Sequence, residues 1–252
     1  MRTFTLLLLA VALQDAPARR DPWIGFGEGS WVILARKVKE GEKVQETREK
    51  HLLLAPRDGT PVRQVQKEKD GAFVPNTTET THAQGVPLEG AEWGEAKTRS
   101  EELTVDGKTF ACTVSEHVVE KGEARGKLAV WRSAAAKVPY REIVRDGPDM
   151  ALMADILRVE VSIERGARKD AHAVRVTALV EKLRVGTRDV TCAVEEWTFE
   201  EIRGGGETRK GTIRRWLSDE VPGRVVKMEG KLVAAGKSVE MTVEASDFGV
   251  KP

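Results

Sequence analysis

The main pattern along this chain is the alternation of apolar and polar residues with a period of two. It is clear in residues 31–39 and 44–54, two runs that the turn Glu40-Gly41-Glu42-Lys43 joins. Alternation of this kind puts apolar side chains on one face of a β-strand and polar ones on the other. Similar runs recur in pairs along the chain, at 62–67 with 72–74, 110–120 with 128–131, 155–164 with 171–180, 190–202 with 212–216, and 231–235 with 239–245. The pattern therefore predicts a series of antiparallel hairpins.

Few segments depart from this pattern. The Thr-rich tract 76–84 predicts a loop over a face or mouth of the sheet. A short helix capped by Asp149 is expected over 150–157, and a second one over 91–99. The chain should thus contain little helix.

The sequence also contains an internal repeat. The segment from Leu103 to Cys112 returns 80 residues later as the segment from Leu183 to Cys192. Two later landmarks return in the same order, Trp131-Arg132-Ser133 as Trp216-Leu217-Ser218, and Val138-Pro139 as Val221-Pro222. The second copy is longer between its Cys and its Trp, and a hairpin turn at Gly204-Gly205-Gly206 absorbs this length. We interpret residues 19–147 as a first β repeat with an insertion at about 55–100, and residues 148–252 as a second repeat.

These elements predict an all-β fold. Long strands with one charged face need cover on the other face, and antiparallel sheets provide it by curving or by stacking. The expected architecture is a strongly curved antiparallel sheet, either a half-barrel or a β-sandwich, built from two degenerate repeats. Aromatic residues are 5% of the chain, so its core should consist mainly of Val, Leu and Ala.

Residues 1–18 have the pattern of a signal peptide. Arg2 precedes a short apolar run, Leu6 to Leu13, and Ala16-Pro17-Ala18 offers a small-residue cleavage site. The run is too short to span a bilayer, which takes about 20 residues. We therefore expect export to the periplasm or the extracellular space, with no transmembrane segment in the mature chain.

The charge balance argues against polyanionic partners. The chain has 41 Lys and Arg against 40 Asp and Glu, a formal net charge of +1, and the charges are interspersed. Nucleic-acid binding usually needs a basic patch or stripe. We expect charged strand faces in water and no nucleic-acid partner.

Two short sequence motifs and the order of the predicted elements resemble those of a known family. The motifs are Trp216-Leu217-Ser218 and Val221-Pro222-Gly223-Arg224-Val225-Val226-Lys227. Together with the signal peptide and the many long strands, they resemble the LolA/LolB/LppX-like exported half-β-barrel proteins. The resemblance implies a curved sheet around an apolar cavity that carries lipids or lipoprotein acyl chains. It matches no ligand-contacting residue of that group.

The two cysteines, Cys112 and Cys192, occupy equivalent repeat positions. An even number of cysteines in an exported protein is compatible with a disulfide. The alternative is two separate buried thiols that act as small hydrophobes, because Val114 and Val194 follow each cysteine on the same strand face.

Three tryptophans are candidates for contact with a ligand. Trp131 and Trp216 end matching strands, where they either line a pocket or anchor the core. Trp93 lies in the polar insertion and is expected near a surface or mouth.

No catalytic constellation is visible. The four histidines lack the spacing of a metal site, and the G-x-S-x-G motif is absent. We expect a non-enzymatic envelope protein without cofactor or metal that binds an apolar or lipid-like small molecule. The alternative is a structural or protein-interaction module of the envelope with a closed, ligand-free core.

Overall fold

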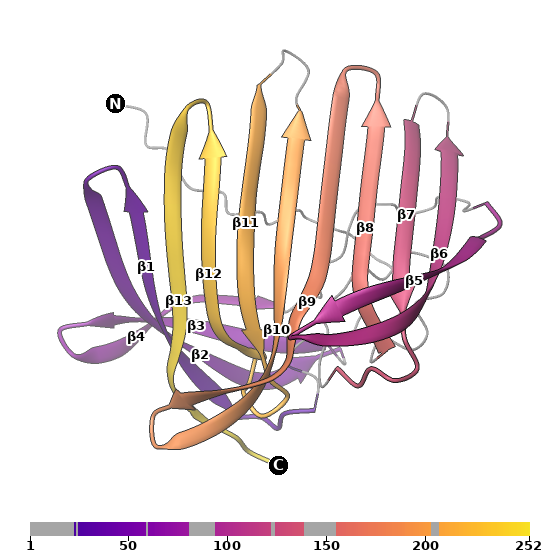
Figure 1. Cartoon of the computed structure of the whole chain (residues 1–252). Helices are drawn as coiled ribbons and strands as arrows, with labels where there is room; N and C mark the ends of the chain where they lie inside the picture. Colours follow the sequence, from indigo (N-terminus) through magenta and orange to yellow (C-terminus); the bar gives the residue numbers. More distant parts are fainter. Residues whose placement is uncertain are drawn as a thin grey trace.

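The computed structural model describes residues 23, 25–58, 60–80, 94–121, 124–138, 155–202 and 207–252. This part of the chain forms one antiparallel sheet of 13 strands (Figure 1). The strands are β1 (Trp31–Glu40), β2 (Lys43–Arg57), β3 (Thr60–Lys69), β4 (Ala72–Thr80), β5 (Lys97–Val105), β6 (Lys108–Lys121), β7 (Ala124–Arg132), β8 (Ile156–Arg165), β9 (Arg168–Val185), β10 (Arg188–Ile202), β11 (Thr208–Leu217), β12 (Val225–Ala234) and β13 (Lys237–Gly249).

The chain enters and leaves the sheet near its middle. β1 pairs with β13, and β2, β3 and β4 continue outward from β1 to one edge. β5 forms the opposite edge, and β6 to β12 lead back to β13. The sheet is not closed into a barrel, and the described residues contain no helix. The prediction of a curved, antiparallel all-β fold is confirmed.

Tight turns fix the register of several hairpins. Asp70-Gly71 and Asp106-Gly107 connect β3 to β4 and β5 to β6, and all four residues have positive φ. Two consecutive residues of this kind form the turn that matches the twist of the flanking strands. Ala235-Gly236 makes the same turn between β12 and β13, within the hairpin predicted over 231–245.

The pairing register gives the sheet two unlike faces. Thr198 pairs with Thr212 on what we call the front face, and Trp197 pairs with Ile213 on the back face. The two threonines are exposed, and Trp197 and Ile213 are half-buried. The period-two pattern in the sequence therefore describes a solvated front and an apolar back.

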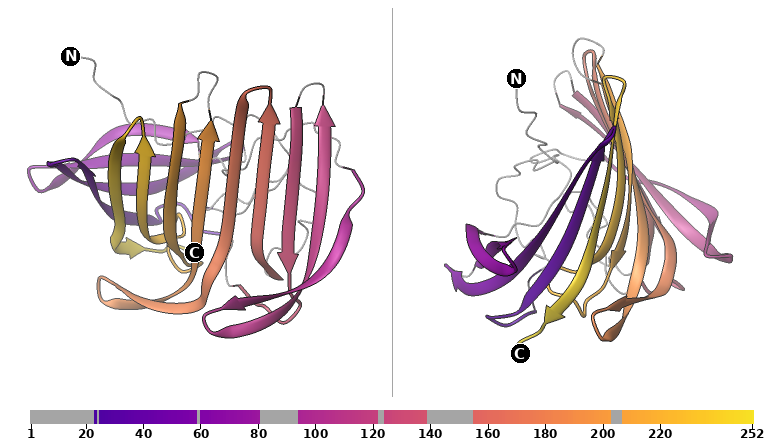
Figure 2. Two further views of the ribbon diagram at one scale, coloured as in Figure 1. Left: turned by 45° about the horizontal axis from the view of Figure 1, so that its top comes forward. Right: turned by 90° about the vertical axis from the view of Figure 1, so that its left-hand side faces the viewer.

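Two hairpins, β5–β6 and β9–β10, fold across the front face at their ends (Figure 1). Figure 2 shows β5 and β6 projecting to one side of the sheet, while β2, β3 and β4 curve to the other. The ends of the β5–β6 and β9–β10 hairpins bury two apolar clusters against the strands that follow them. A bulge in the β9–β10 pairing, next to Val194, accompanies the bend of the second hairpin.

The two repeat copies have matching pairs in these clusters. Val114 pairs with Trp131 in one, and Val194 pairs with Trp216 in the other. A register shift follows each tryptophan, between Trp131 and Arg132 and between Trp216 and Leu217. The sequence landmarks thus mark the same local structure, a hairpin end packed over the tryptophan of the next strand.

Both cysteines are free and buried, one in each cluster. The disulfide considered from the sequence is not formed: both thiols are free, and they belong to different clusters. Burial raises the pKa of Cys112, and that of Cys192 to about 12. The alternative of two buried thiols describes the structure.

Three local predictions differ from the structure. Residues 76–80 of the expected loop belong to β4, since β-branched threonines favour an extended strand. Lys97 to Arg99 of one expected helix begin β5, where they pair with β6. Ile156 and Leu157 of the other begin β8. Its residues 150–154, the signal peptide and Gly204 to Gly206 lie outside the described residues.

A glycine beneath an aromatic ring provides a test of the back-face packing. A Cβ at Gly211 would lie 2.6 Å from Cζ of Phe199 and from the carbonyl oxygen of Lys231, whereas one at Gly230 would meet nothing closer than 3.6 Å. We expect Gly211→Ala to lower the free energy of unfolding by about 1–3 kcal/mol, as overpacking does. Gly230→Ala should change it by less than about 1 kcal/mol. Urea denaturation of both variants measures this, and equal effects would contradict the packing.

The cysteines provide a second test. Only the thiolate attacks iodoacetamide, and with a pKa of about 12 about one Cys192 thiol in 10,000 is ionised at pH 8. The native chain should therefore resist alkylation, while the chain unfolded in guanidinium without reductant should gain two adducts by mass spectrometry. An unfolded chain that gains adducts only after reduction would show that a disulfide exists.

Candidate functional site

A continuous apolar band crosses the back face. One row of paired residues contains Val130, Val159, Val174, Trp197, Ile213, Gly230, Met241 and Val38. The neighbouring row contains Leu128, Val161, His172, Phe199, Gly211, Leu232 and Val239. We call these two rows the back-face band.

Burial varies along the back-face band. Its members on β7, β8 and β9 include side chains such as Val130 and Val159 that are fully buried. On β10, β11 and β12 the members Trp197, Phe199, Ile213 and Leu232 are only half-buried. His172 stacks on Phe199 with ring centroids 6.4 Å apart, and desolvation lowers its pKa, which favours the neutral imidazole. Met241 on β13 is buried again, with 7% of its surface exposed, so the middle of the band is its accessible apolar part.

A buried ion pair borders the band on β10 and β11. Glu195 is 2% exposed and Arg215 is 8% exposed. Oε1 of Glu195 accepts hydrogen bonds from Nε of Arg215 at 2.9 Å and from the Trp197 indole at 2.6 Å. The guanidinium also lies over the Trp197 ring, 4.4 Å from its centroid. Each buried charge thus has a partner, as the low dielectric requires.

A polar cluster occupies the back of β2, β3 and β4. Nη1 of Arg63 lies 3.4 Å from Nδ1 of His51, and Nε2 of His51 lies 3.3 Å from Oε2 of Glu49. Because arginine can only donate, Nδ1 accepts and Nε2–H donates to Glu49. Arg63 also pairs with Glu79. The hydrogen bond from His51 lowers the pKa of Glu49 against the effect of burial, and the positive charges of Lys67 and Arg36 lower it further.

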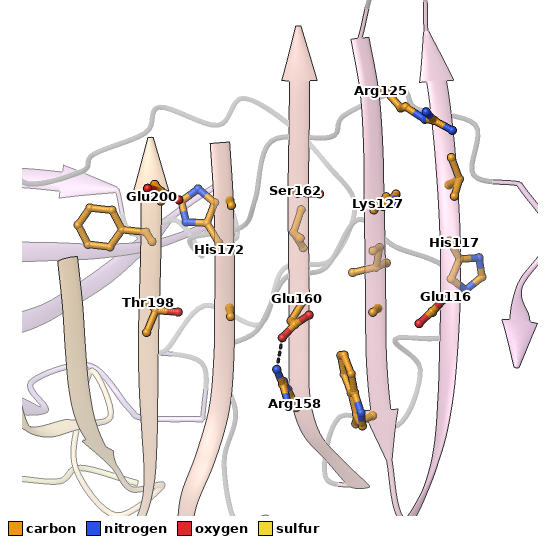
Figure 3. Close-up of a pocket in the computed structure, with 18 of the residues that line it drawn as sticks. Glu116, His117, Arg125, Lys127, Arg158, Glu160, Ser162, His172, Thr198 and Glu200 are labelled. Atoms are coloured by element: carbon orange, nitrogen blue, oxygen red, sulfur yellow. Dashed lines mark hydrogen bonds and ion pairs between the residues drawn. The ribbon is translucent and has the colours of Figure 1, made fainter. Parts of the chain in front are cut away.

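A shallow trough of about 1340 Å³ lies over the sheet (Figure 3), and its lining combines front-face residues with His172 and Phe199 of the back-face band. Its floor contains small side chains such as Ser162, Ala171 and Ala173, and charged side chains surround them. Arg158 pairs with Glu160, as the dashed line in Figure 3 shows. Arg99 pairs with both Glu101 and Glu116. These charges neutralise one another across the strands, so the trough has the character of a solvated sheet face.

The structure separates the tryptophans that the sequence singled out. Trp131 is 3% exposed and Trp216 is 5% exposed, and they belong to different clusters. Each ring is flanked by two cationic side chains, Arg99 and Arg158 at Trp131, and Arg214 and Lys227 at Trp216. Both anchor hairpin ends, and Trp131 also lines the trough. Trp93 lies outside the described residues.

Sequence reasoning missed the polar cluster and the buried ion pair. The available signal was a spacing of two within one strand, Glu49 with His51 on β2 and Glu195 with Trp197 on β10. That spacing places two side chains on the same face, but their partners Arg63 and Arg215 come from neighbouring strands. Only the register identifies those partners.

Two further classes of feature are absent from the described part of the chain. No three His, Cys, Asp or Glu side chains there lie close enough together to hold a metal ion. It also contains no helix long and apolar enough to cross a membrane.

No family model and no curated protein matches this chain. Five solved chains match it in structure. One is the crystal structure of a protein described as a lipoprotein from Parabacteroides distasonis, with a TM-score of 0.37 and 9% sequence identity over 88% of this chain and 96% of that one. Similarity at this level supports no inference about function.

Proposed function

We propose that this protein is an exported, non-enzymatic protein of the cell envelope that binds an apolar or lipid-like ligand on the back face of its sheet. The observation that carries the proposal is the half-buried middle part of the back-face band on β10, β11 and β12. Export is supported by the signal-peptide pattern of residues 1–18.

The two faces of the same strands differ in a way that favours this role. On β10 and β11 the front carries exposed Thr198, Glu200 and Thr212, while the back carries Trp197 and Ile213. Contiguous apolar patches larger than a few hundred Å² are unusual on soluble proteins and commonly mark binding sites. From β10 to β13 the second row of the band, with Phe199, Leu232 and Val239, stays half-buried over three strand steps, about 14 Å, which suits an elongated apolar molecule.

Burial of the ligand would supply the binding free energy. Transfer of apolar surface from water contributes about 25 cal/mol per Å², or about 0.8 kcal/mol for each buried methylene. The aromatic members Trp197 and Phe199 offer the largest contact areas on the band. Nothing in this arrangement requires a reacting group, so the proposed role is binding alone.

Neighbouring residues on β11 provide a matched test. Ile213→Lys would place a charged amine in the band, and Thr212→Lys would place the same group on the front. We expect Ile213→Lys to weaken binding of the fluorescent apolar probe phenylnaphthylamine at least about tenfold, because a charge on an apolar surface must be desolvated when the probe binds. Thr212→Lys should change the probe's Kd by less than about twofold.

The same titrations distinguish the structural alternative. If the wild-type chain binds no probe, carries no lipid in native mass spectra, and loses more than about 3 kcal/mol of stability in Ile213→Lys, the band is a closed core. That set of results would favour a structural or interaction module and contradict the proposal.

A further inference from the structure

Arg36, beside the back-face band, has a buried Nε without a hydrogen-bond partner among the described residues. Arg63 and Arg209 have such an Nε too, but each of them is in an ion pair. Arg36 on β1 pairs in register with Val243 on β13 and with Thr47 on β2. It is half-buried, its Nε is shielded from solvent, and this Nε has no hydrogen-bond partner among the described residues. Buried polar atoms are nearly always paired in native proteins, so an unpaired one calls for an explanation.

Arg215 lies in the same row as Arg36 and is neutralised by a carboxylate within the sheet. Arg215, Met228, Val243 and Arg36 follow one another in a single row of the back face. Arg215 has the buried carboxylate of Glu195 directly opposite on β10. The corresponding neighbour of Arg36 on β2 is Thr47, which has no charge. The two arginines share a row, but the structure neutralises only Arg215.

The surroundings of Arg36 contain charges of both signs, since Arg36 and Lys67 line a recess with Glu46, Glu68 and Glu244. Lys67 on β3 has no ion-pair partner within the described ranges, and it lies opposite Glu49 in the register. Glu49 already accepts the hydrogen bond of His51. Arg36 and Lys67 act on Glu49 electrostatically without reaching ion-pair distance. A binding group for a second anion is therefore available next to Glu49.

The position of Arg36 connects this charge to the band. Val38, a member of the band, is two residues away on the same face of β1, which corresponds to about 7 Å along a strand. Val243, which faces Arg36, is 7% exposed and lies beside Met241 of the band. A ligand lying along the band would bring one of its ends to Arg36.

We infer that Arg36, assisted by Lys67, binds the oxyanion headgroup, a carboxylate or phosphate, of an amphiphile whose apolar chain lies on the back-face band. A guanidinium is planar and presents paired donors that match these groups. This inference rests on the proposed function and narrows its ligand from apolar molecules in general to anionic amphiphiles.

The test uses two probes with the same chain, dansylundecanoic acid and its uncharged methyl ester, titrated into the full purified protein at low ionic strength. The wild type should bind the acid about tenfold more tightly than the ester. Arg36→Gln should reduce this preference to within about twofold and leave the affinity for the ester unchanged. Lys67→Gln should reduce it by a smaller factor.

Lys37→Gln is the matched control. Lys37 neighbours Arg36 on β1 but lies on the front face, where its amine is 2.9 Å from Glu46. Its removal changes the net charge by the same amount and should leave the preference for the acid intact. If Lys37→Gln lowers the preference as much as Arg36→Gln does, a general field is responsible and the inference is overturned.

The remaining outcomes separate the two proposals. If neither probe binds the wild type, the proposed function fails. If both bind with equal affinity, the inference about the headgroup fails while the proposed function stands. Inorganic phosphate that binds Arg36 as tightly as the acid does would indicate a site for a free oxyanion and would also overturn the inference. Should Arg36→Gln not fold, the ratio of the two affinities in the wild type still decides.

Discussion

The register of the strand pairs determines which side chains in this protein meet water. A slip of one residue in any pair would exchange the front and back faces of the strand. On β11, for example, it would turn Ile213 and Arg215 toward the solvent and bring Arg214 to the apolar side. Two-residue turns with positive φ, such as Asp106-Gly107, hold the register at the hairpin ends. The front-face ion pairs and the back-face band both follow from this one constraint.

A sheet of this length cannot cover both of its faces alone. The protein covers part of the front by folding the β5–β6 and β9–β10 hairpins across it, and each hairpin buries a tryptophan, Trp131 or Trp216, with a cysteine. Cationic side chains lie over both tryptophan rings, Arg158 over Trp131 and Lys227 over Trp216. These cation–π contacts place charged groups at the border of each apolar cluster. The internal repeat thus encodes the same packing arrangement twice, a hairpin end that buries a cysteine and a tryptophan. This accounts for Trp and Cys being the clearest landmarks of the repeat.

How far the sequence predicts this structure depends on the distance over which its signals act. Alternation and Gly-containing turns are local, and they predicted the hairpins β1–β2, β6–β7 and β12–β13. The pairing of β1 with β13 joins residues about 200 positions apart, and no local pattern indicates it. The same limit explains the cysteines. Equivalent positions in two repeats suggested proximity, but whether the copies face each other or follow one another along a sheet depends on the order of the strands. The polar cluster was missed for this reason too, because His51 and Arg63 meet only through the pairing of β2 with β3.

The charged residues of the back face show that its two ends are not equivalent. Near the centre of the sheet, Glu195, Arg215 and Trp197 satisfy one another, so a charge there is compatible with a dry interior. Toward β1 to β3 the charges are matched less closely: Glu79 pairs with Arg63, while Arg36 and Lys67 act on Glu49 without forming an ion pair among the described residues. A face that served only as a core would gain stability from an apolar residue at position 36, because an uncompensated charge opposes burial. The apolar band is complementary to the apolar chain of an anionic amphiphile, and Arg36 beside it is complementary to the negative headgroup. This complementarity connects the fold to its proposed ligand.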